Sequence, residues 1–152
     1  MKIIGKRFDD LSPGLLYDIM VLRQEVFVVE QDCPYLDADG KDLEAIHLVG
    51  FVNGELVAYA RVMPIGVSYD EYASIGRVIV TRDYRRQGLG TEVLAAAIRA
   101  CREHFHTDRI KISAQTYTLK LYEELGFRAV GPQYLEDGIP HRAMILEESN
   151  NF

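Results

Sequence analysis

The stretch Ile75-Gly76-Arg77-Val78-Ile79-Val80-Thr81-Arg82-Asp83-Tyr84-Arg85-Arg86-Gln87-Gly88-Leu89-Gly90, with the Ala-rich run that continues to Cys101, decides the fold of this 152-residue chain. An apolar, β-branched segment, a short polar connection and a helix-forming run predict a strand, a turn and a helix. The first backbone N–H groups of a helix lack intrahelical acceptors and can bind an anion. Gly88 and Gly90 have no Cβ, so a ligand can approach the backbone closely. The sequence therefore predicts a phosphate-binding loop.

The glycine spacing narrows the kind of phosphate loop. The chain lacks the three glycines of the dinucleotide fingerprint and the Gly-Lys-Ser/Thr end of the Walker loop. Arg85-x-x-Gly88-x-Gly90 instead resembles the Arg/Gln-x-x-Gly-x-Gly/Ala signature of the GNAT N-acetyltransferases, whose loop amides hold the pyrophosphate of acetyl-CoA. The segment Leu121-Tyr122-Glu123-Glu124-Leu125-Gly126-Phe127 is similar to the second motif of that family. The alternative is a helix that simply starts after a glycine turn.

Two further segments resemble one branch of this superfamily. They are Phe27-Val28-Val29-Glu30-Gln31-x-Cys33-Pro34-Tyr35, followed by Asp39-Gly40-x-Asp42, and Glu136-Asp137-Gly138-Ile139-Pro140-His141. With the central motifs, the resemblance to the ElaA-like branch covers almost the whole chain. A Ca²⁺ loop competes for the aspartates at 37, 39 and 42, but the glycine comes too early and the closing glutamate is missing. No metal site is therefore expected.

Composition limits the remaining possibilities. One domain spanning residues 1–152 suffices for a chain of this length, and a 48% hydrophobic content favours a compact globule. A net charge of −6 and an isoelectric point near 5.2 argue against nucleic acid or an anionic membrane as partner. Cys33 and Cys101 form neither a disulfide framework nor a zinc motif, and no signal sequence is evident, so a cytoplasmic protein is expected. Cys101 is expected in the core, and Cys33 is expected to be a packed or loop residue, with a nucleophilic thiol as the alternative.

The hydrophobic pattern predicts a mixed α/β fold, with a largely antiparallel sheet, a parallel crossover and flanking helices. Ser12-Pro13 is expected to cap the first helix, and Val26 to Tyr35 is expected to form a loop after it. The GNAT resemblance implies an acyl-CoA N-acyltransferase fold in which two central strands splay apart. We expect strands at Lys2–Phe8, Ala45–Phe51, Glu55–Met63, Ser74–Val80, Arg109–Ala114, Phe127–Val130 and Arg142–Leu146, and helices at Leu89–Phe105 and Thr116–Leu125.

The same resemblance implies a set of functional residues. Tyr122 matches a tyrosine placed to protonate the CoA sulfur, and its alternative role is packing on the helix face. The cofactor, acetyl-CoA, is expected to meet the strand backbone through its pantetheine arm and the loop through its pyrophosphate. The cofactor-binding residues are then Val78, Ile79, Val80, Arg85, Arg86, Gln87, Gly88, Leu89, Gly90, Thr91 and Gln115.

The general base and the acceptor are left open. Many relatives carry a glutamate in the strand before the loop, but Ser74–Val80 contains Arg77 and no carboxylate. The candidates for a base or an acceptor contact are Glu30, Asp137 and His141, and an amine can also lose its proton to water. His47 and Arg61 can face the groove from their strands, although a strand histidine is more often structural.

The predicted activity is transfer of the acetyl group of acetyl-CoA to a primary amine by direct transfer in a ternary complex. An inactive acyl-CoA-binding sensor and a nucleotide-binding enzyme are the alternatives. The sequence specifies neither the acceptor, nor the acyl-chain preference, nor the oligomeric state, and a homodimer remains open.

Overall fold

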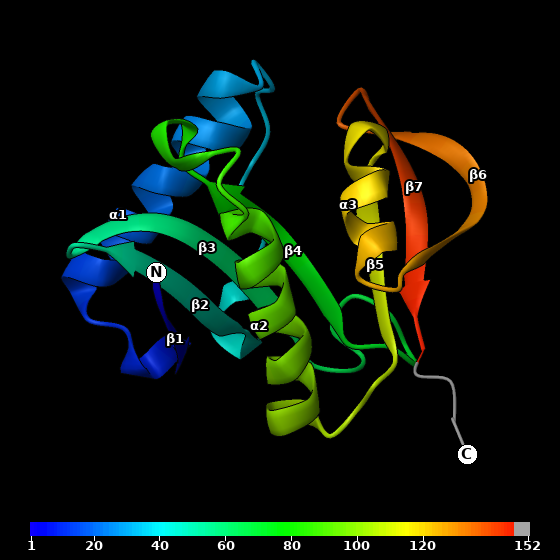
Figure 1. Cartoon of the computed structure of the whole chain (residues 1–152), viewed down its shortest axis with the longest axis horizontal. Helices are drawn as coiled ribbons and strands as arrows, with labels where there is room; N and C mark the ends of the chain where they lie inside the picture. Colours follow the sequence, from blue (N-terminus) through cyan, green and yellow to red (C-terminus); the bar gives the residue numbers. More distant parts are fainter. Residues whose placement is uncertain (148–152) are drawn as a thin grey trace.

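The computed structural model describes residues 1–147, which form two β-sheets and three α-helices (Figure 1). The strands are β1 (Lys2–Arg7), β2 (Ile46–Val52), β3 (Glu55–Met63), β4 (Ser74–Val80), β5 (Ile110–Gln115), β6 (Arg128–Glu136) and β7 (Ile139–Leu146). The α-helices are α1 (Pro13–Arg23), α2 (Leu89–Phe105) and α3 (Leu119–Glu124). Shorter helical turns cover Phe8–Asp10, Gln24–Glu30, Asp42–Glu44, Arg82–Tyr84 and Thr116–Thr118. This is the mixed, largely antiparallel α/β architecture predicted from the sequence.

The two sheets meet at one point and then separate. One sheet has the order β1-β2-β3-β4 and the other β5-β7-β6, and all pairings within them are antiparallel. A parallel bridge joins Ala73, just before β4, to Ile110 at the start of β5. Beyond it β4 and β5 diverge, as Figure 1 shows. The predicted parallel crossover through α2 and the predicted splaying of the two central strands are both confirmed.

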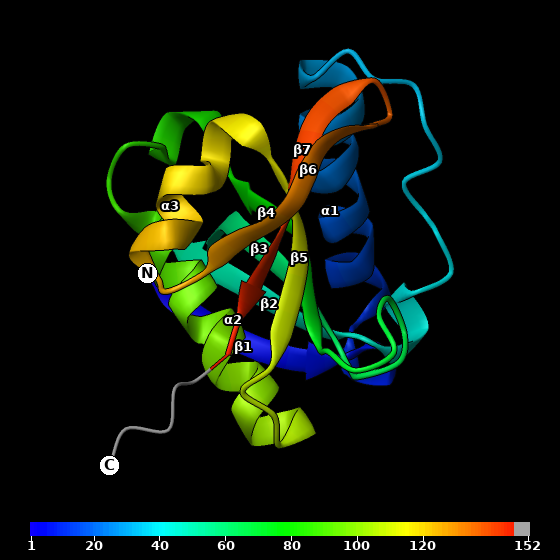
Figure 2. The ribbon, with the colours of Figure 1, turned by 90° about the vertical axis from the view of Figure 1, so that its right-hand side faces the viewer.

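Helices cover both faces of the larger sheet (Figure 2). On one face, the buried residues Leu94, Ala97 and Cys101 of α2 pack with Leu48 and Ala58 of the sheet. On the other face, residues of α1 join the cluster Ile19, Leu22, Val49, Tyr59 and Ile79. Because strand side chains alternate between faces, a four-stranded sheet can support both clusters at once.

Helix α1 begins as predicted but the helical path ends later than expected. Ser12 Oγ accepts a hydrogen bond from Leu15 N at 3.1 Å, and Pro13 occupies the first turn. Past Arg23, Gln24–Glu30 continues as a π-helical turn, with Gln31 N donating to Val26 O at 3.2 Å. The expectation of a loop from Val26 was therefore wrong by one wide helical turn. The turn carries Glu30 toward the groove described below.

The closing strands are also longer than predicted. β6 and β7 form a hairpin around Asp137 and Gly138, whose φ angles are +52° and +77°. Two consecutive residues with positive φ are the requirement of a type I′ hairpin turn, and Asp-Gly is a preferred pair for it. The hairpin brings Tyr134 opposite His141 in the strand register.

A buried ionic network ties the loop after α1 to the larger sheet. Arg23, whose side chain is 0% exposed, donates to Asp37 at 2.9 Å and to Asp42 at 2.7 Å. Arg61 of β3 bonds Asp42 at 2.9 Å as well as Asp39, and Arg77 of β4 bonds Asp37 at 2.8 Å. Three arginines and three aspartates thus neutralise one another, and the aspartates considered for Ca²⁺ accept arginine hydrogen bonds.

In the described residues no helix combines the length and the apolarity that crossing a membrane requires.

Arg23 is expected to be essential for this arrangement. Arg23→Met keeps much of the side-chain length but leaves buried carboxylates short of a partner, which typically costs about 3–5 kcal/mol. We expect urea unfolding to show a loss of that size. Arg99→Met, which replaces an exposed arginine on α2, is the matched control and should change the free energy of unfolding by less than about 0.5 kcal/mol. Equal losses in both variants would contradict a structural role of the network.

Candidate active site

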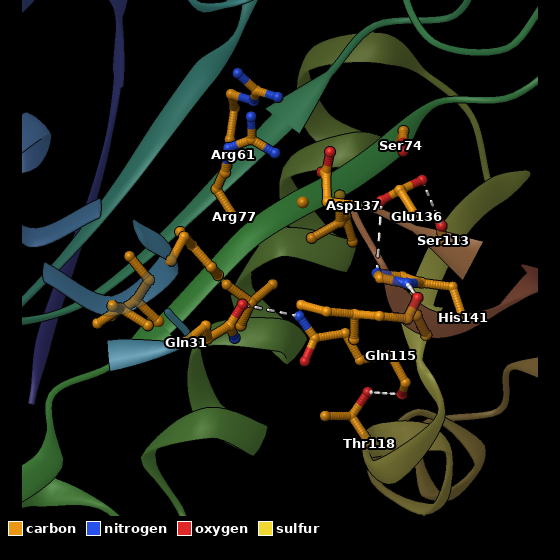
Figure 3. Close-up of a pocket in the computed structure, with 18 of the residues that line it drawn as sticks. Gln31, Arg61, Ser74, Arg77, Ser113, Gln115, Thr118, Glu136, Asp137 and His141 are labelled. Carbon is orange, nitrogen blue, oxygen red and sulfur yellow. Dashed lines mark hydrogen bonds and ion pairs between the residues drawn. The ribbon is translucent and has the colours of Figure 1, made fainter. Parts of the chain in front are cut away.

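A groove of about 730 Å³ opens where β4 and β5 diverge. Its lining comes from both sheets, from the turn after α1, from the N-terminus of α2 and from α3. Figure 3 shows Arg61 and Arg77 on one side of it and Glu136, Ser113 and His141 on the other. The groove is therefore the place where the sequence motifs converge.

The β4 wall presents a free strand edge and a bulge. β4 is the last strand of its sheet, so its outer edge faces the groove with backbone groups that β3 does not use. Ile79 pairs with Tyr59 and Gly76 with Arg61, so Arg77 and Val78 together oppose Ala60. Arg77 has φ +50°, and its hydrogen bonds to Asp37 hold this unusual backbone conformation. Val78, Ile79 and Val80 all line the groove.

The glycine loop leads directly from β4 into α2. Gly88 is the N-cap of α2 with φ +80°, a conformation that glycine adopts without strain. Of the predicted loop residues, Arg85 and Gly90 line the groove, whereas Arg86, Gln87, Gly88, Leu89 and Thr91 lie beside it along the chain. The first amides of a helix such as α2 have no helical acceptors, which is the general property on which the anion-site prediction rests.

Arg85 has protein partners on both sides. Its Nε donates to Val80 O at 2.8 Å, and its two terminal nitrogens bond the carboxylate of Glu30 at 2.8 and 3.1 Å. These hydrogen bonds lower the pKa of Glu30, which makes its carboxylate a poorer base. Arg85 thus joins the turn after α1 to the end of β4.

Tyr122 lies on α3 and lines the groove. Its ring packs edge-on against Phe127, with centroids 5.7 Å apart. Burial raises the pKa of Tyr122 to about 12, so its hydroxyl keeps its proton at neutral pH and can only act there as a hydrogen-bond or proton donor, or as an acceptor of a bond. The same residue therefore has both a packing contact and a chemically competent hydroxyl.

Gln115, at the end of β5, spans the groove. Its Nε2 donates to Gln31 Oε1 at 3.2 Å, and Thr118 Oγ1 donates to the Gln115 carbonyl at 2.7 Å (Figure 3). Gln31 follows the π-helical turn, so this side-chain pair connects the two walls. A ligand that runs between β4 and β5 would meet both amides.

The β6–β7 hairpin contributes a polar cluster that includes His141. The His141 ring is only 6% exposed and stacks on Tyr134, and its Nδ1 lies 2.7 Å from the Ile139 carbonyl. Since a carbonyl oxygen can only accept, Nδ1 carries the proton and the neutral ring has its lone pair on Nε2. Nε2 lies 3.5 Å from Glu136 Oε2, which would pair with the ring once it is protonated.

Glu136 is itself held in place. Ser113 Oγ donates to Glu136 Oε1 at 3.1 Å and is also hydrogen-bonded to the Tyr134 hydroxyl. The sequence analysis missed Glu136, Ser113 and Tyr134 as site residues. The sequence signal that could have identified them is the alternation of side chains along β5 and β6. It places residues 113 and 115 on one face of β5, and residues 134 and 136 on one face of β6.

Of three further residues weighed from the sequence, Asp137 and Arg61 line the groove and His47 does not. Asp137 lines the groove at the hairpin turn, and its backbone carbonyl accepts a hydrogen bond from Cys33 Sγ at 3.4 Å. His47 is fully buried and bonds Tyr59 OH at 2.6 Å and Asp42 O at 2.9 Å, outside the groove lining. Arg61 does line the groove. The structural alternative for His47 therefore fits its surroundings.

The family model described as "Acetyltransferase (GNAT) domain" matches residues 35–148. A UPF0039 protein from Synechocystis sp. is 43% identical over 148 residues, which covers 96% of this chain and 95% of the relative. Protein ElaA from Escherichia coli is 39% identical over 140 residues, or 91% of each chain.

Solved structures agree with these sequence matches. The crystal structure of E. coli ElaA has a TM-score of 0.89 and 37% identity, covering 96% of this chain and 99% of ElaA. An acyl-CoA N-acyltransferase from Pseudomonas aeruginosa has a TM-score of 0.88, the same identity and the same coverage. The chain therefore belongs to the GNAT acetyltransferase family, in the branch that contains ElaA.

Proposed function

We propose that this protein is an acetyl-CoA-dependent N-acetyltransferase that transfers the acetyl group directly to a primary amine within a ternary complex. One observation carries the proposal: the free edge of β4 and the N-terminus of α2 lead into the same groove that Tyr122 and His141 line. A strand edge suits an extended amide-bearing arm, and a helix N-terminus suits phosphate. CoA combines both chemistries in one molecule.

The cofactor would lie along β4 and end at the loop. Its pantetheine amides would pair with the backbone of Val78 and Val80, beside Ile79. The pyrophosphate would take the amides of residues 88–91, with Arg86 and Gln87 at the surface of the loop. Arg85, already bonded to Glu30 and Val80, would act mainly by fixing the loop. Gln115 would contact the arm near the thioester.

The reaction needs a proton acceptor on the amine side, and His141 fits this role better than Glu30 or Asp137. Nε2 of the neutral ring has a free lone pair, and the Glu136 carboxylate, 3.5 Å from Nε2, would stabilise the imidazolium. Glu30 is engaged by Arg85. The amine nitrogen then attacks the thioester carbonyl, forming the C–N bond while the C–S bond breaks, and its proton passes to Nε2. Tyr122 donates to the departing sulfur.

Gly88→Val should abolish the stabilisation that acetyl-CoA gives. A branched side chain at φ +80° would be strained by about 1–2 kcal/mol and would also displace the loop amides from the pyrophosphate. For the wild type, ligand at about 100 times its dissociation constant should add about 2.7 kcal/mol, whereas ATP should add little because it lacks the pantetheine arm.

Gly54→Val supplies the matched control, because Gly54 has the same φ of +80° and equally open surroundings in the β2–β3 turn. It should lose similar stability but keep the response to acetyl-CoA in a thermal-shift assay and in calorimetric titration. Equal wild-type responses to ATP and acetyl-CoA would refute the CoA assignment. Binding without CoA release toward any amine would favour a sensor.

Tyr122→Phe should lower the turnover number by about 10²–10⁴-fold while changing acetyl-CoA affinity only slightly, because the hydroxyl acts mainly in the transition state. The ring and its contact with Phe127 remain in this variant. Turnover is measured as CoA release with the best amine of a panel, and Tyr17→Phe, at an exposed tyrosine of α1, is the control. Turnover within a few-fold of wild type would leave Tyr122 with a packing role alone.

His141→Asn should reduce kcat/KM for the amine by about 10²–10⁴-fold near neutral pH. The asparagine amide can still donate to the Ile139 carbonyl, but it has no basic nitrogen in place of Nε2. The deficit should shrink at high pH, where more of the amine is already neutral. His104→Asn, at an exposed position on α2, should behave as wild type. A pH-independent deficit would assign His141 to structure instead of proton transfer.

A further inference from the structure

Lys41 stands out because its charge is not balanced by the network beside it. It is half-buried, lines the groove, and its ammonium donates to Ser68 Oγ at 3.2 Å. Within residues 1–147 no carboxylate lies within ion-pair distance of it. The neighbouring arginines are matched by Asp37, Asp39 and Asp42. Lys41 therefore leaves this wall of the groove with a net positive charge.

A second polar group points to the same wall. Arg61 is 2% exposed and lines the groove, and its Nε is a buried donor without a partner in the described part of the chain. An unpaired buried donor carries a desolvation cost that a ligand oxygen can remove. The Lys41 ammonium lacks a carboxylate partner and Arg61 Nε lacks any acceptor, so this wall has hydrogen-bond donors to offer an anion.

The opposite wall carries the carboxylate of Glu136, and a short segment connects the two walls. Ser68, the partner of Lys41, is followed by Tyr69, which also lines the groove. Burial raises the pKa of Tyr69 to about 12, and the nearby Tyr134 and Glu136 contribute to that rise. Tyr69 and Glu136 line the same groove, and so do Lys41 and Ser68.

We propose that the acceptor is zwitterionic, an amine that also carries a carboxylate, with its amine at Glu136 and His141 and its carboxylate at Lys41. This inference rests on the proposed function and adds the substrate class. A simple alkylamine would leave Lys41 without a counterion. The carboxylate of an amino acid would pair with Lys41, and its amine would lie at Glu136 and His141.

The test compares acceptors that differ only in the negative group. The probes are the L-amino acids and straight-chain ω-amino acids, each with its carboxamide and its decarboxylated amine, assayed by CoA release with acetyl-CoA. The wild type should prefer the acid over its own amide in kcat/KM by about 10- to 100-fold, the usual size of a charged hydrogen bond. The preference should appear in KM more than in kcat.

Variants at Lys41 test whether this residue binds the carboxylate of the acceptor. Lys41→Met keeps the alkyl stem and should remove most of the preference for the acid, and Lys41→Arg should restore part of it. The backbone bond from Lys41 N to Asp39 Oδ1 survives both changes. Lys2→Met, at an exposed lysine on β1, removes the same charge away from the groove and should leave the preference intact.

The outcomes separate this inference from the activity on which it rests. Turnover of amides or simple amines that equals or exceeds that of the acids would overturn the zwitterion proposal while supporting acetyl transfer. An acid preference that Lys41→Met leaves unchanged would overturn the role of Lys41. Acetyl-CoA binding without turnover of any acid would also refute the inference, whereas the absence of acetyl-CoA binding would refute the proposed function itself.

Discussion

The site depends on the divergence of β4 and β5 after a single parallel bridge between Ala73 and Ile110. Had the two strands remained paired, their backbone groups would have been used by each other and no groove would exist. Separation leaves β4 with an unpaired edge, a feature that folded proteins normally protect. Here α2 and α3 border the opening, and in the proposed function the cofactor uses this edge. The same geometry explains why the functional side chains come from segments far apart in sequence.

The ionic network shapes one wall of this opening. Burial alone would raise the pKa of Asp42, but hydrogen bonds from Arg23 and Arg61 outweigh it and lower the pKa. An aspartate whose folded pKa is depressed stabilises the fold above the unfolded value of about 3.9, and this contribution is lost as the pH falls below it. Since buried ion pairs repay little more than their desolvation, the network contributes placement of the chain more than net stability. It fixes Arg77 at its positive φ and thereby the bulge in β4.

Local sequence patterns predicted much of the fold and only part of the site. β4 and α2 have the predicted bounds because strand, glycine turn and helix are each specified within a few neighbouring residues. The partners of Arg23 could not be predicted, since Asp37 and Asp42 reach it only through the folded loop. The hairpin was underestimated although Asp137-Gly138 is a turn signal, because β6 is mostly exposed and lacks a clear apolar alternation. Glu136 was missed for the same reason, because it lies at the end of β6, beyond the predicted strand.

The two proton-handling groups are suited to different parts of the reaction. Tyr122 has a pKa of about 12, and a thiol has an ordinary pKa of about 8.5, so complete transfer from the phenol to the thiolate is unfavourable by roughly a thousandfold or more. In the proposed mechanism, Tyr122 would therefore act as a hydrogen-bond donor to the sulfur while negative charge develops there. In the proposed mechanism, the proton that finally neutralises the thiolate is the one that His141 took from the amine. In this proposal Glu136, whose Oε2 lies 3.5 Å from Nε2, would hold the charge of the imidazolium, so that the hairpin wall would take the place of a carboxylate in β4.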